Sequence, residues 1–391
     1  MTAPYYLVLR RFVRRRSALF AAAKILLGLT LLSGSCRSHK PALPPAADAP
    51  VRGVWLTNVG SQVLYSRAGI DEAMARCAQH GINHVFVVVW NKGRTQYPSR
   101  LMADTFGIPI EENMAGRDPL REVLDAAKPH NIRVYAWFEF GFAAQNGTFG
   151  QEILRQKPDW AARGHDGQVV VKNGFTWMNG FDPAVQSFML GLVKEVVRNY
   201  PDLTGIQGDD RLPAMPVETG YNPNVVADYR ADHNGAAPPD NPRDSTWVNW
   251  RADRLNRFMK RLHDEVRAVR PGVRISMAPS IYPFSKTEYL QDWPTWVRNG
   301  WVDLVCPQVY RYDIALYRQE LARIVTEQVP ANQRGRLAPG VLLKVNQYRP
   351  TTDYLRQMIA ENRRHGLTGE VFFYYEGLRE QPAFFEQYRR P

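Results

Sequence analysis

Short apolar segments alternate with amphipathic segments along most of the chain. The apolar segments are rich in Val, Ile and aromatic residues, which favour buried strands, and each is followed by a loop and a segment with helical periodicity. Strands are predicted over residues 51–57, 84–90, 133–139, 204–210, 274–280, 303–310, 336–343 and 370–376. Helices are predicted over residues 70–80, 119–130, 183–200, 246–269, 291–299, 314–328, 351–365 and 382–390. This alternation predicts an α/β fold, a single (β/α)8 TIM barrel.

A doubly wound open sheet is the alternative fold. It would require a glycine-rich phosphate loop after the first strand, and residues 57–61 (TNVGS) lack the G-x-G-x-x-G pattern. In the predicted helix over residues 183–200, the apolar side chains recur at helical spacing and are expected to face the sheet. They are Val185, Phe188, Met189, Leu192, Val193 and Val196.

Long loops are predicted after strands 3 and 4, over residues 140–181 and 211–245. The second is rich in Pro, Asn, Asp and Gly. Loops of this length at the carboxyl ends of barrel strands are usually walls or lids of a functional site, although a tolerated surface insertion is the alternative.

The N-terminal segment has the composition of an export signal. Residues 1–35 contain six basic side chains and no acidic one, and the apolar stretch over residues 18–32 is too short to span a membrane comfortably. The approach Ser33-Gly34-Ser35 to Cys36 resembles the lipobox of bacterial lipoproteins. We therefore expect a lipoprotein signal peptide over 1–35, lipid on Cys36, a Pro/Ala-rich tether over 36–50 and the barrel over 51–391. An ordinary signal peptide or a signal anchor is the alternative.

These features predict the bacterial cell envelope as location, with a lipid anchor in the membrane and the barrel facing the periplasm. The formal net charge of +12 first suggests nucleic acid as a partner. Removal of residues 1–35 leaves 44 basic and 38 acidic residues, a net charge of +6, and the basic side chains of residues 251–270 are interleaved with acidic ones. Nucleic acid is therefore not expected, and nothing indicates a protein partner.

Carboxylates, amides and aromatic rings gather at the predicted carboxyl ends of the strands, where barrels carry their chemistry. A sugar ring stacks its C–H faces on aromatic rings and offers hydroxyls to planar polar groups, so this inventory predicts a polysaccharide substrate. The predicted substrate-binding residues are Trp90, Asn91, Trp137, Tyr282, Gln308, Tyr310, Asn346 and Tyr375. Because strand side chains alternate, some of the aromatic residues among them must face the helices instead.

Asp209 and Asp210 at the end of the fourth strand are the strongest candidates for chemistry. Successive side chains of a strand point to opposite sides, so one enters the barrel mouth and the other can brace it. A carboxyl group crowded by a like charge has a raised pKa, which suits a general acid. The alternative is that the pair caps a loop or binds Arg211. No His recurs with a carboxylate at metal-ligand spacing, so neither a metal nor a cofactor is expected.

Several motifs in order along the chain resemble the glycosyl-hydrolase-like 10 family of bacterial barrels. They are VRGVWLT (51–57), VVWNKGRTQYPS (88–99), VYAWF (134–138), DP (182–183), GIQGDD (205–210), WR (250–251) with NRF (256–258), WVDLVCPQVY (301–310) and GEVFFY (369–374). The resemblance implies a TIM-barrel glycosidase acting on bacterial glycans with N-acetylated amino sugars, such as peptidoglycan strands without stem peptides. The chain is also similar to the barrel that cuts partly deacetylated poly-N-acetylglucosamine.

In those relatives the strand-four Asp pair is the suspected catalytic centre, which corresponds to Asp209 and Asp210. The family commonly reads DGIHFDDY there, whereas this chain has Thr204 for the first Asp, Gln207-Gly208 for His and the aromatic residue, and Arg211 for Tyr. This departure removes the polar contact that the His supplies in the family, and it therefore also affects the choice of sugar.

The predicted mechanism uses Asp210 as general acid, Asp209 to orient it or to polarise an N-acetyl group, and Glu139 or Glu376 as second carboxylate. Residues 342–346 (LLKVN) hold no acid where many retaining barrel glycosidases place their nucleophile, so retention, inversion and assistance by the substrate's acetamide all stay open. Two other functions also stay open: a non-catalytic glycan-binding barrel and a metal-dependent glycan deacetylase.

Overall fold

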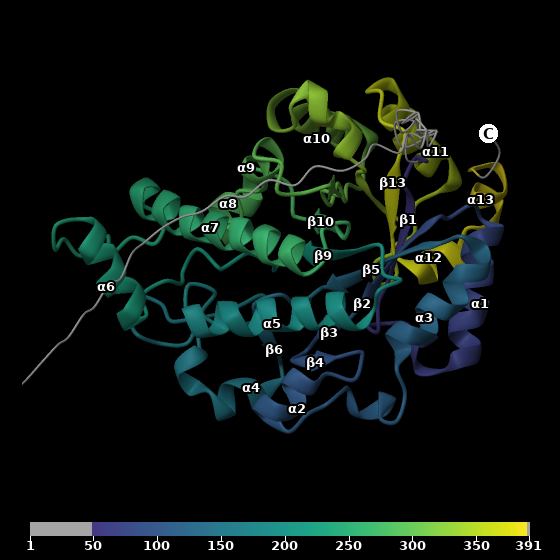
Figure 1. Ribbon diagram of the computed structural model, residues 1–391. Coiled ribbons are helices and arrows are strands. Elements are labelled where there is room, and N and C mark those ends of the chain that lie inside the picture. Colours follow the sequence, from purple (N-terminus) through teal and green to yellow (C-terminus); the bar gives the residue numbers. More distant parts are fainter. Residues whose placement is uncertain (1–48, 389–391) are drawn as a thin grey trace, which may run out of the picture. The chain divides into compact units, whose positions relative to one another are not determined.

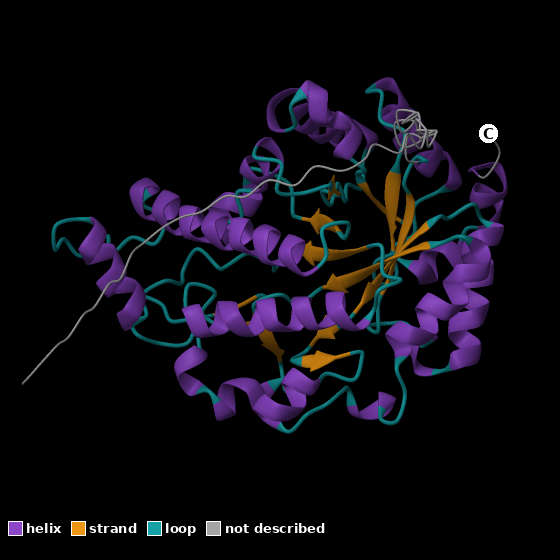
Figure 2. Ribbon diagram, viewed as in Figure 1, coloured by secondary structure: helices purple, strands orange, loops and turns teal. Residues whose placement is uncertain are grey.

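Eight parallel strands form one curled sheet, and helices surround it (Figures 1 and 2). The computed structural model describes residues 49–388. The predicted signal peptide, Cys36 and the predicted tether up to residue 48 lie outside the described residues. The strands are β1 (Arg52–Leu56), β2 (His84–Val88), β5 (Arg133–Phe138), β9 (Gly205–Asp209), β10 (Arg274–Ala278), β11 (Leu304–Val305), β12 (Gly340–Leu342) and β13 (Glu370–Phe373).

The sheet has the order β11-β10-β9-β5-β2-β1-β13-β12, so strands that follow each other along the chain are neighbours almost throughout. Isolated parallel bridges pair Val305 with Leu337 and Gln308 with Gly340, and so connect the β11 edge to the β12 edge. The predicted α/β class with eight parallel strands is confirmed. Their carboxyl ends lie together at one end of the curled sheet, which is called the mouth below.

Eight helices follow the strands in the predicted alternation. They are α1 (Arg67–Gln79), α3 (Pro119–Ala127), α5 (Pro183–Asn199), α7 (Ser245–Val269), α9 (Trp293–Arg298), α10 (Ile314–Arg323), α11 (Thr352–Arg364) and α13 (Pro382–Tyr388). Helix α5 begins where the Asp182 side chain accepts a hydrogen bond from the Ala184 amide and Pro183 fixes the first turn. All six apolar residues that were expected to face the sheet from this helix are buried.

All eight strands are shorter than predicted, and three of them, β11, β12 and β13, are shortened for an identifiable local reason. Strand β11 ends before Pro307, which has no amide hydrogen to continue the ladder. Residues 331–336 form a 3-10 helix, so β12 begins only at Gly340. Strand β13 stops at Phe373 because the chain turns into α12 (Tyr375–Glu380), a helix that the pattern did not predict.

The segments after β5 and β9 carry structure of their own. Between β5 and α5 lie β6 (Ala143–Asn146), α4 (Gln151–Gln156), β7 (Val171–Lys172) and β8 (Phe175–Trp177), with β8 paired antiparallel to both β6 and β7. Between β9 and α7 lies α6 (Pro223–Asp232). Other short elements are β3 (Trp90–Asn91), β4 (Arg94–Thr95), α2 (Arg100–Phe106) and α8 (Phe284–Tyr289).

A buried polar chain crosses the interior of the curled sheet below the mouth. Trp55 on β1 donates its indole N–H to Gln207 Oε1 at 2.7 Å, and Gln207 Nε2 donates to Ser276 Oγ on β10 at 2.9 Å. The Trp137 ring on β5 lies 6.4 Å from the Trp55 ring. Gln207 therefore faces the interior, and Asp209, two residues further along β9, faces the same side at the mouth.

Candidate active site

Three carboxyl groups meet at the mouth, where β5 and β9 lie side by side. Phe138 pairs with Gly208 in the parallel register, so Glu139 and Asp209 follow at the ends of adjacent strands. Their side chains differ in exposure: 3% for Asp209, 13% for Glu139 and 25% for Asp210. A ligand above the mouth therefore has most access to Asp210.

The side chain of Arg211 lies near all three acids. The guanidinium of Arg211 lies 3.2 Å from Asp210 Oδ1, 3.7 Å from Asp209 Oδ2 and 4.0 Å from Glu139 Oε1. Its Nε also donates to the backbone carbonyl of Glu139 at 3.2 Å. The cluster would carry two net negative charges if every acid were ionised, which favours retention of at least one proton.

Neutral amides hold two of the acids in place. Gln308 Nε2 donates to Asp209 Oδ1 at 2.8 Å, and Asn91 Nδ2 donates to Glu139 Oε2. Thr57 Oγ1 lies 3.4 Å from the same Glu139 oxygen. Two of the predicted substrate-binding residues, Asn91 and Gln308, are thus committed to orienting carboxyl groups.

The surroundings raise two carboxyl pKa values. Burial raises the pKa of Asp209 well above its usual value, the charge of Asp210 adds to this, and Arg211 opposes it. Burial also raises the pKa of Glu139, against the lowering effects of Arg211 and of the hydrogen bond from Asn91. Asp209 and Glu139 therefore keep their protons to a higher pH than carboxyl groups in water do.

Asp209→Asn is expected to stabilise the protein at neutral pH. With a raised pKa, folded Asp209 keeps its proton over a pH range in which the unfolded chain has lost it, so the folded state binds more protons and stability falls as pH rises through that range. Asparagine has no ionisable group, so the variant loses this pH-dependent destabilisation. We therefore expect its melting temperature to lie about 1 to 3 °C above that of the wild type at pH 7.5, and we expect this difference between the two proteins to shrink toward pH 4. Calorimetry over a range of pH measures the melting temperatures, and Asp240→Asn, at an exposed residue, is the control. A destabilised Asp209→Asn at pH 7.5 would contradict this electrostatic description.

Aromatic rings form the floor beside the acids. The Tyr310 ring lies 5.2 Å from Phe373, and the Phe373 ring lies 6.0 Å from Trp55. Burial and the charges of Asp209 and Asp210 raise the pKa of the Tyr310 phenol, so this side chain lies close to the pair. The sequence pattern does not predict Phe373 as a site residue, because it predicts that the last strand continues to residue 376.

The other predicted aromatic residues lie elsewhere. Trp137 is buried in the interior layer beneath the mouth. Trp90 is fully buried, donates its indole N–H to the Gly141 carbonyl at 2.9 Å, and packs on Phe188 of α5. Tyr375 is buried beside Cys77 and Arg76 of α1. Trp90 and Tyr375 therefore belong to the packing between sheet and helices.

Three further predicted residues are not brought into the carboxyl cluster. Glu376 lies on α12, where its carboxylate accepts from Ser61 Oγ at 2.8 Å and pairs with Arg379 at 3.1 Å. Tyr282 is half-buried beyond β10, and its carbonyl accepts from Gln328. Asn346 is exposed in a turn after β12 with φ of 48°.

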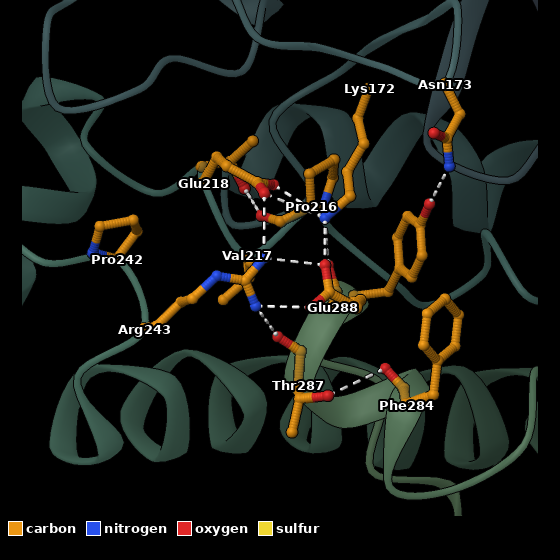
Figure 3. Close-up of polar contacts among 12 residues, drawn as sticks. Lys172, Asn173, Pro216, Val217, Glu218, Pro242, Arg243, Phe284, Thr287 and Glu288 are labelled. Carbon is orange, nitrogen blue, oxygen red and sulfur yellow. Dashed lines mark hydrogen bonds and ion pairs between the residues drawn. The ribbon is translucent and has the colours of Figure 1, made fainter.

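An ion-pair network joins the segment after β5, the segment after β9 and α8. Lys172 of β7 bridges Glu218 at 3.0 Å and Glu288 at 2.9 Å, and Arg243 contacts Glu288 at 2.5 Å (Figure 3). The hydrogen bond from Arg243 and the contact with Lys172 lower the pKa of Glu288 to about 2. Tyr289 follows Glu288, and the charge of Asp210 contributes to the raised pKa of its phenol.

Residues 49–388 contain no cluster of three or more His, Cys, Asp or Glu side chains arranged to hold a metal ion. No helix within that range is long and apolar enough to cross a membrane.

Fold and site together define a class: an α/β protein with a curled, eight-stranded parallel sheet and a carboxyl cluster at the mouth, like the TIM-barrel glycoside hydrolases. The chain belongs to the glycosyl hydrolase-like 10 family, whose model matches residues 50–346.

Named relatives and a solved structure agree with this placement. The chain is 28% identical over 357 residues to "Glycosyl hydrolase DigH" of Escherichia coli K12, covering 74% of this chain and 77% of the relative. It is 21% identical over 294 residues to "Glycosyl hydrolase YngK" of Bacillus subtilis, covering 68% of this chain and only 54% of that relative. The glycoside hydrolase domain of PgaB (BpsB) from Bordetella bronchiseptica superposes with a TM-score of 0.65 at 14% identity, covering 87% of this chain and 98% of that domain. The last likeness is one of fold.

Proposed function

We propose that this chain hydrolyses glycosidic bonds in a bacterial glycan that contains amino sugars, such as peptide-free peptidoglycan strands or poly-N-acetylglucosamine. The observation that carries the proposal is the cluster of Asp209, Asp210 and Glu139 around Arg211, with raised pKa values of Asp209 and Glu139. The family's description and the names of DigH, YngK and the PgaB domain support it.

In the proposed mechanism, Asp210 protonates the leaving oxygen because it is the most exposed of the three acids. Buried Asp209 orients Asp210 and is itself held by the hydrogen bond from Gln308. Glu139 is the second carboxylate, since it lies on the adjacent strand and shares Arg211 with the pair. Glu376 is less suited to this role, because Ser61 and Arg379 occupy its carboxylate.

The negative charge near the anomeric carbon has two possible sources in this scheme, Glu139 or the acetamide of the substrate itself. Lys344 lies after β12, the strand on which many retaining barrel glycosidases carry their nucleophilic acid, and it pairs with Glu380 at 2.7 Å. This favours assistance by the acetamide. A fully deacetylated polymer would then resist cleavage at the subsite next to the bond.

A catalytically silent glycan-binding barrel is the second candidate, favoured by one observation: Arg211 contacts all three acids, and its charge opposes the raised pKa values of Asp209 and Glu139. The deciding experiment incubates the protein with peptide-free peptidoglycan strands, poly-N-acetylglucosamine and chito-oligosaccharides, with and without a chelator. New reducing ends that are insensitive to the chelator support the hydrolase. Binding without products supports the silent barrel, and chelator-sensitive release of acetate supports a metal-dependent deacetylase.

We also propose that Cys36 carries lipid and anchors the barrel to a bacterial membrane on its periplasmic side. The proposal rests on the small residues before Cys36 and the Pro/Ala tether after it. Cys36→Ser should move the protein from the membrane fraction to the soluble fraction, as measured by fractionation and immunoblotting, with Cys77→Ser as control. A Cys36→Ser variant that still fractionates with membranes would refute the anchor.

A further inference from the structure

A cavity lies between the loop after β1 and the β3–β4 hairpin. It has a volume of about 330 Å³, and its walls come from the loop after β1, the β3–β4 hairpin, the segment over residues 111–113 and the turn after β6. The lining includes Asn58, Lys92, Glu111, Asn113 and Phe149. None of these side chains has a role in the mechanism proposed above.

The cavity is continuous in sequence with the catalytic residues at two points. Lys92 directly follows Asn91, and Asn58 directly follows Thr57. Asn91 and Thr57 both contact Oε2 of Glu139. Because consecutive Cα atoms are about 3.8 Å apart, the backbone at these two walls of the cavity lies within one residue of the residues that contact Glu139.

Phe149 gives the cavity an exposed aromatic surface. It is 58% exposed, although most large apolar side chains of the described chain are buried. Lys92 Nζ lies 4.4 Å from the ring centroid over one face of the ring, so Lys92 does not cover the other face. An exposed aromatic face beside polar groups is the arrangement on which the C–H face of a sugar packs.

The polar groups of the cavity are available to a ligand. Arg94 and Glu152 pair with each other at 3.0 Å. Lys92 and Glu111, in contrast, form no ion pair among residues 49–388, and together they offer donors and acceptors to sugar hydroxyls.

The turn that carries Phe149 is held against the β3–β4 hairpin by its own backbone. Gly150 has φ of +79°, and a Cβ there would lie 2.1 Å from the Ala144 carbonyl oxygen and 2.7 Å from the Lys92 carbonyl oxygen. Only glycine permits this approach, so Phe149 and Lys92 are kept together before any ligand arrives.

We propose that this cavity is a distal sugar-binding subsite, which packs one pyranose ring of the glycan on Phe149 while the bond to be cut lies at Asp210. The inference rests on the proposed function and extends it: the protein acts on chains long enough to occupy both places. Lys92, Glu111 and Asn113 bind the hydroxyls of that ring.

The test measures kcat/KM of Phe149→Ala on β-1,4-linked N-acetylglucosamine oligomers of increasing length. Oligomers too short to reach the cavity should be cut as by wild type, whereas longer ones should lose about 3- to 10-fold in kcat/KM, mostly through KM. Phe149→Tyr, which keeps the ring, should restore wild-type values. Leu316→Ala, at an apolar site on α10 that is also exposed, is the matched control.

An unchanged kcat/KM at every length, or an equal loss at every length, overturns the subsite while leaving the hydrolase intact. If no oligomer is cut, the same series is measured as affinity by calorimetry. A loss confined to long oligomers then supports the subsite although the proposed hydrolysis fails. If no oligomer of any length binds, both the subsite and the proposed hydrolysis are overturned.

Discussion

Replacing Asp210 with Asn is expected to lower kcat on an unactivated glycan by about 10² to 10⁴, with KM changed little. General acid catalysis contributes this much because the leaving oxygen departs poorly without a proton, and Asn has none to give at any accessible pH. The variant should fold normally, since Asp210 is the most exposed of the three acids and Arg211 keeps Asp209 and Glu139 as partners. Initial rates of product formation, measured by mass spectrometry, provide the test.

Three further carboxyl-to-amide variants distinguish the loss of a catalytic group from the loss of a negative charge. Asp240→Asn, at an exposed site, should keep full activity, and so should Glu376→Gln. Glu139→Gln should lose activity, because its carboxyl group is in the cluster. The wild-type kcat/KM should fall as pH rises through the raised pKa of Asp209. An Asp210→Asn variant with near-full activity would contradict the assignment of the general acid.

Replacing Arg251 with Met is expected to produce the largest loss of stability, about 3 to 5 kcal/mol in the free energy of unfolding. Arg251 is completely buried on α7, and its guanidinium donates to the carbonyls of Val217, Thr219 and Pro242. These three residues belong to the segment that follows β9 and Arg211. Methionine fills much of the volume but leaves the buried carbonyl groups of Val217 and Thr219, and the half-buried one of Pro242, without their donor.

Urea denaturation measures the loss, and limited proteolysis should show new cleavage within residues 211–244. Arg257→Met is the matched control, since Arg257 is exposed on the same helix. A variant of Arg251 as stable as Arg257→Met would show that the segment after β9 is held by its other contacts.

The periodicity of the chain was sufficient to predict the sheet, because buried parallel strands read as continuous apolar runs and helices show a 3.6-residue repeat. The meeting of Asp209, Asp210 and Glu139 was also predictable, since carboxyl ends of adjacent parallel strands lie together. Strand-end reasoning failed where a strand ended early. Because β13 stops at Phe373, Tyr375 and Glu376 turn toward α1 and the loop after β1, and Phe373 takes the inward position.

Contacts between distant segments could not be derived from the pattern. Arg211 was considered only as a partner of the Asp pair, yet it also joins Glu139 on the neighbouring strand. Gln207, where the family has His, faces the buried interior and bonds Trp55 and Ser276. Gly208, where the family has an aromatic residue, has Met277 Sδ only 2.5 Å from where a Cβ would lie. These departures alter the interior packing beneath the acids.

Hydrolysis in water enriched in oxygen-18 tests the central claim most directly, because it locates the bond that is broken. The wild-type protein and a chito-oligosaccharide are incubated in labelled water with a chelator, and the products are analysed at once by mass spectrometry. We predict shorter oligosaccharides with one heavy oxygen at each new reducing end, absent with Asp210→Asn. Intact oligosaccharide, or label found only in released acetate, would contradict the claim that this carboxyl cluster cleaves glycosidic bonds.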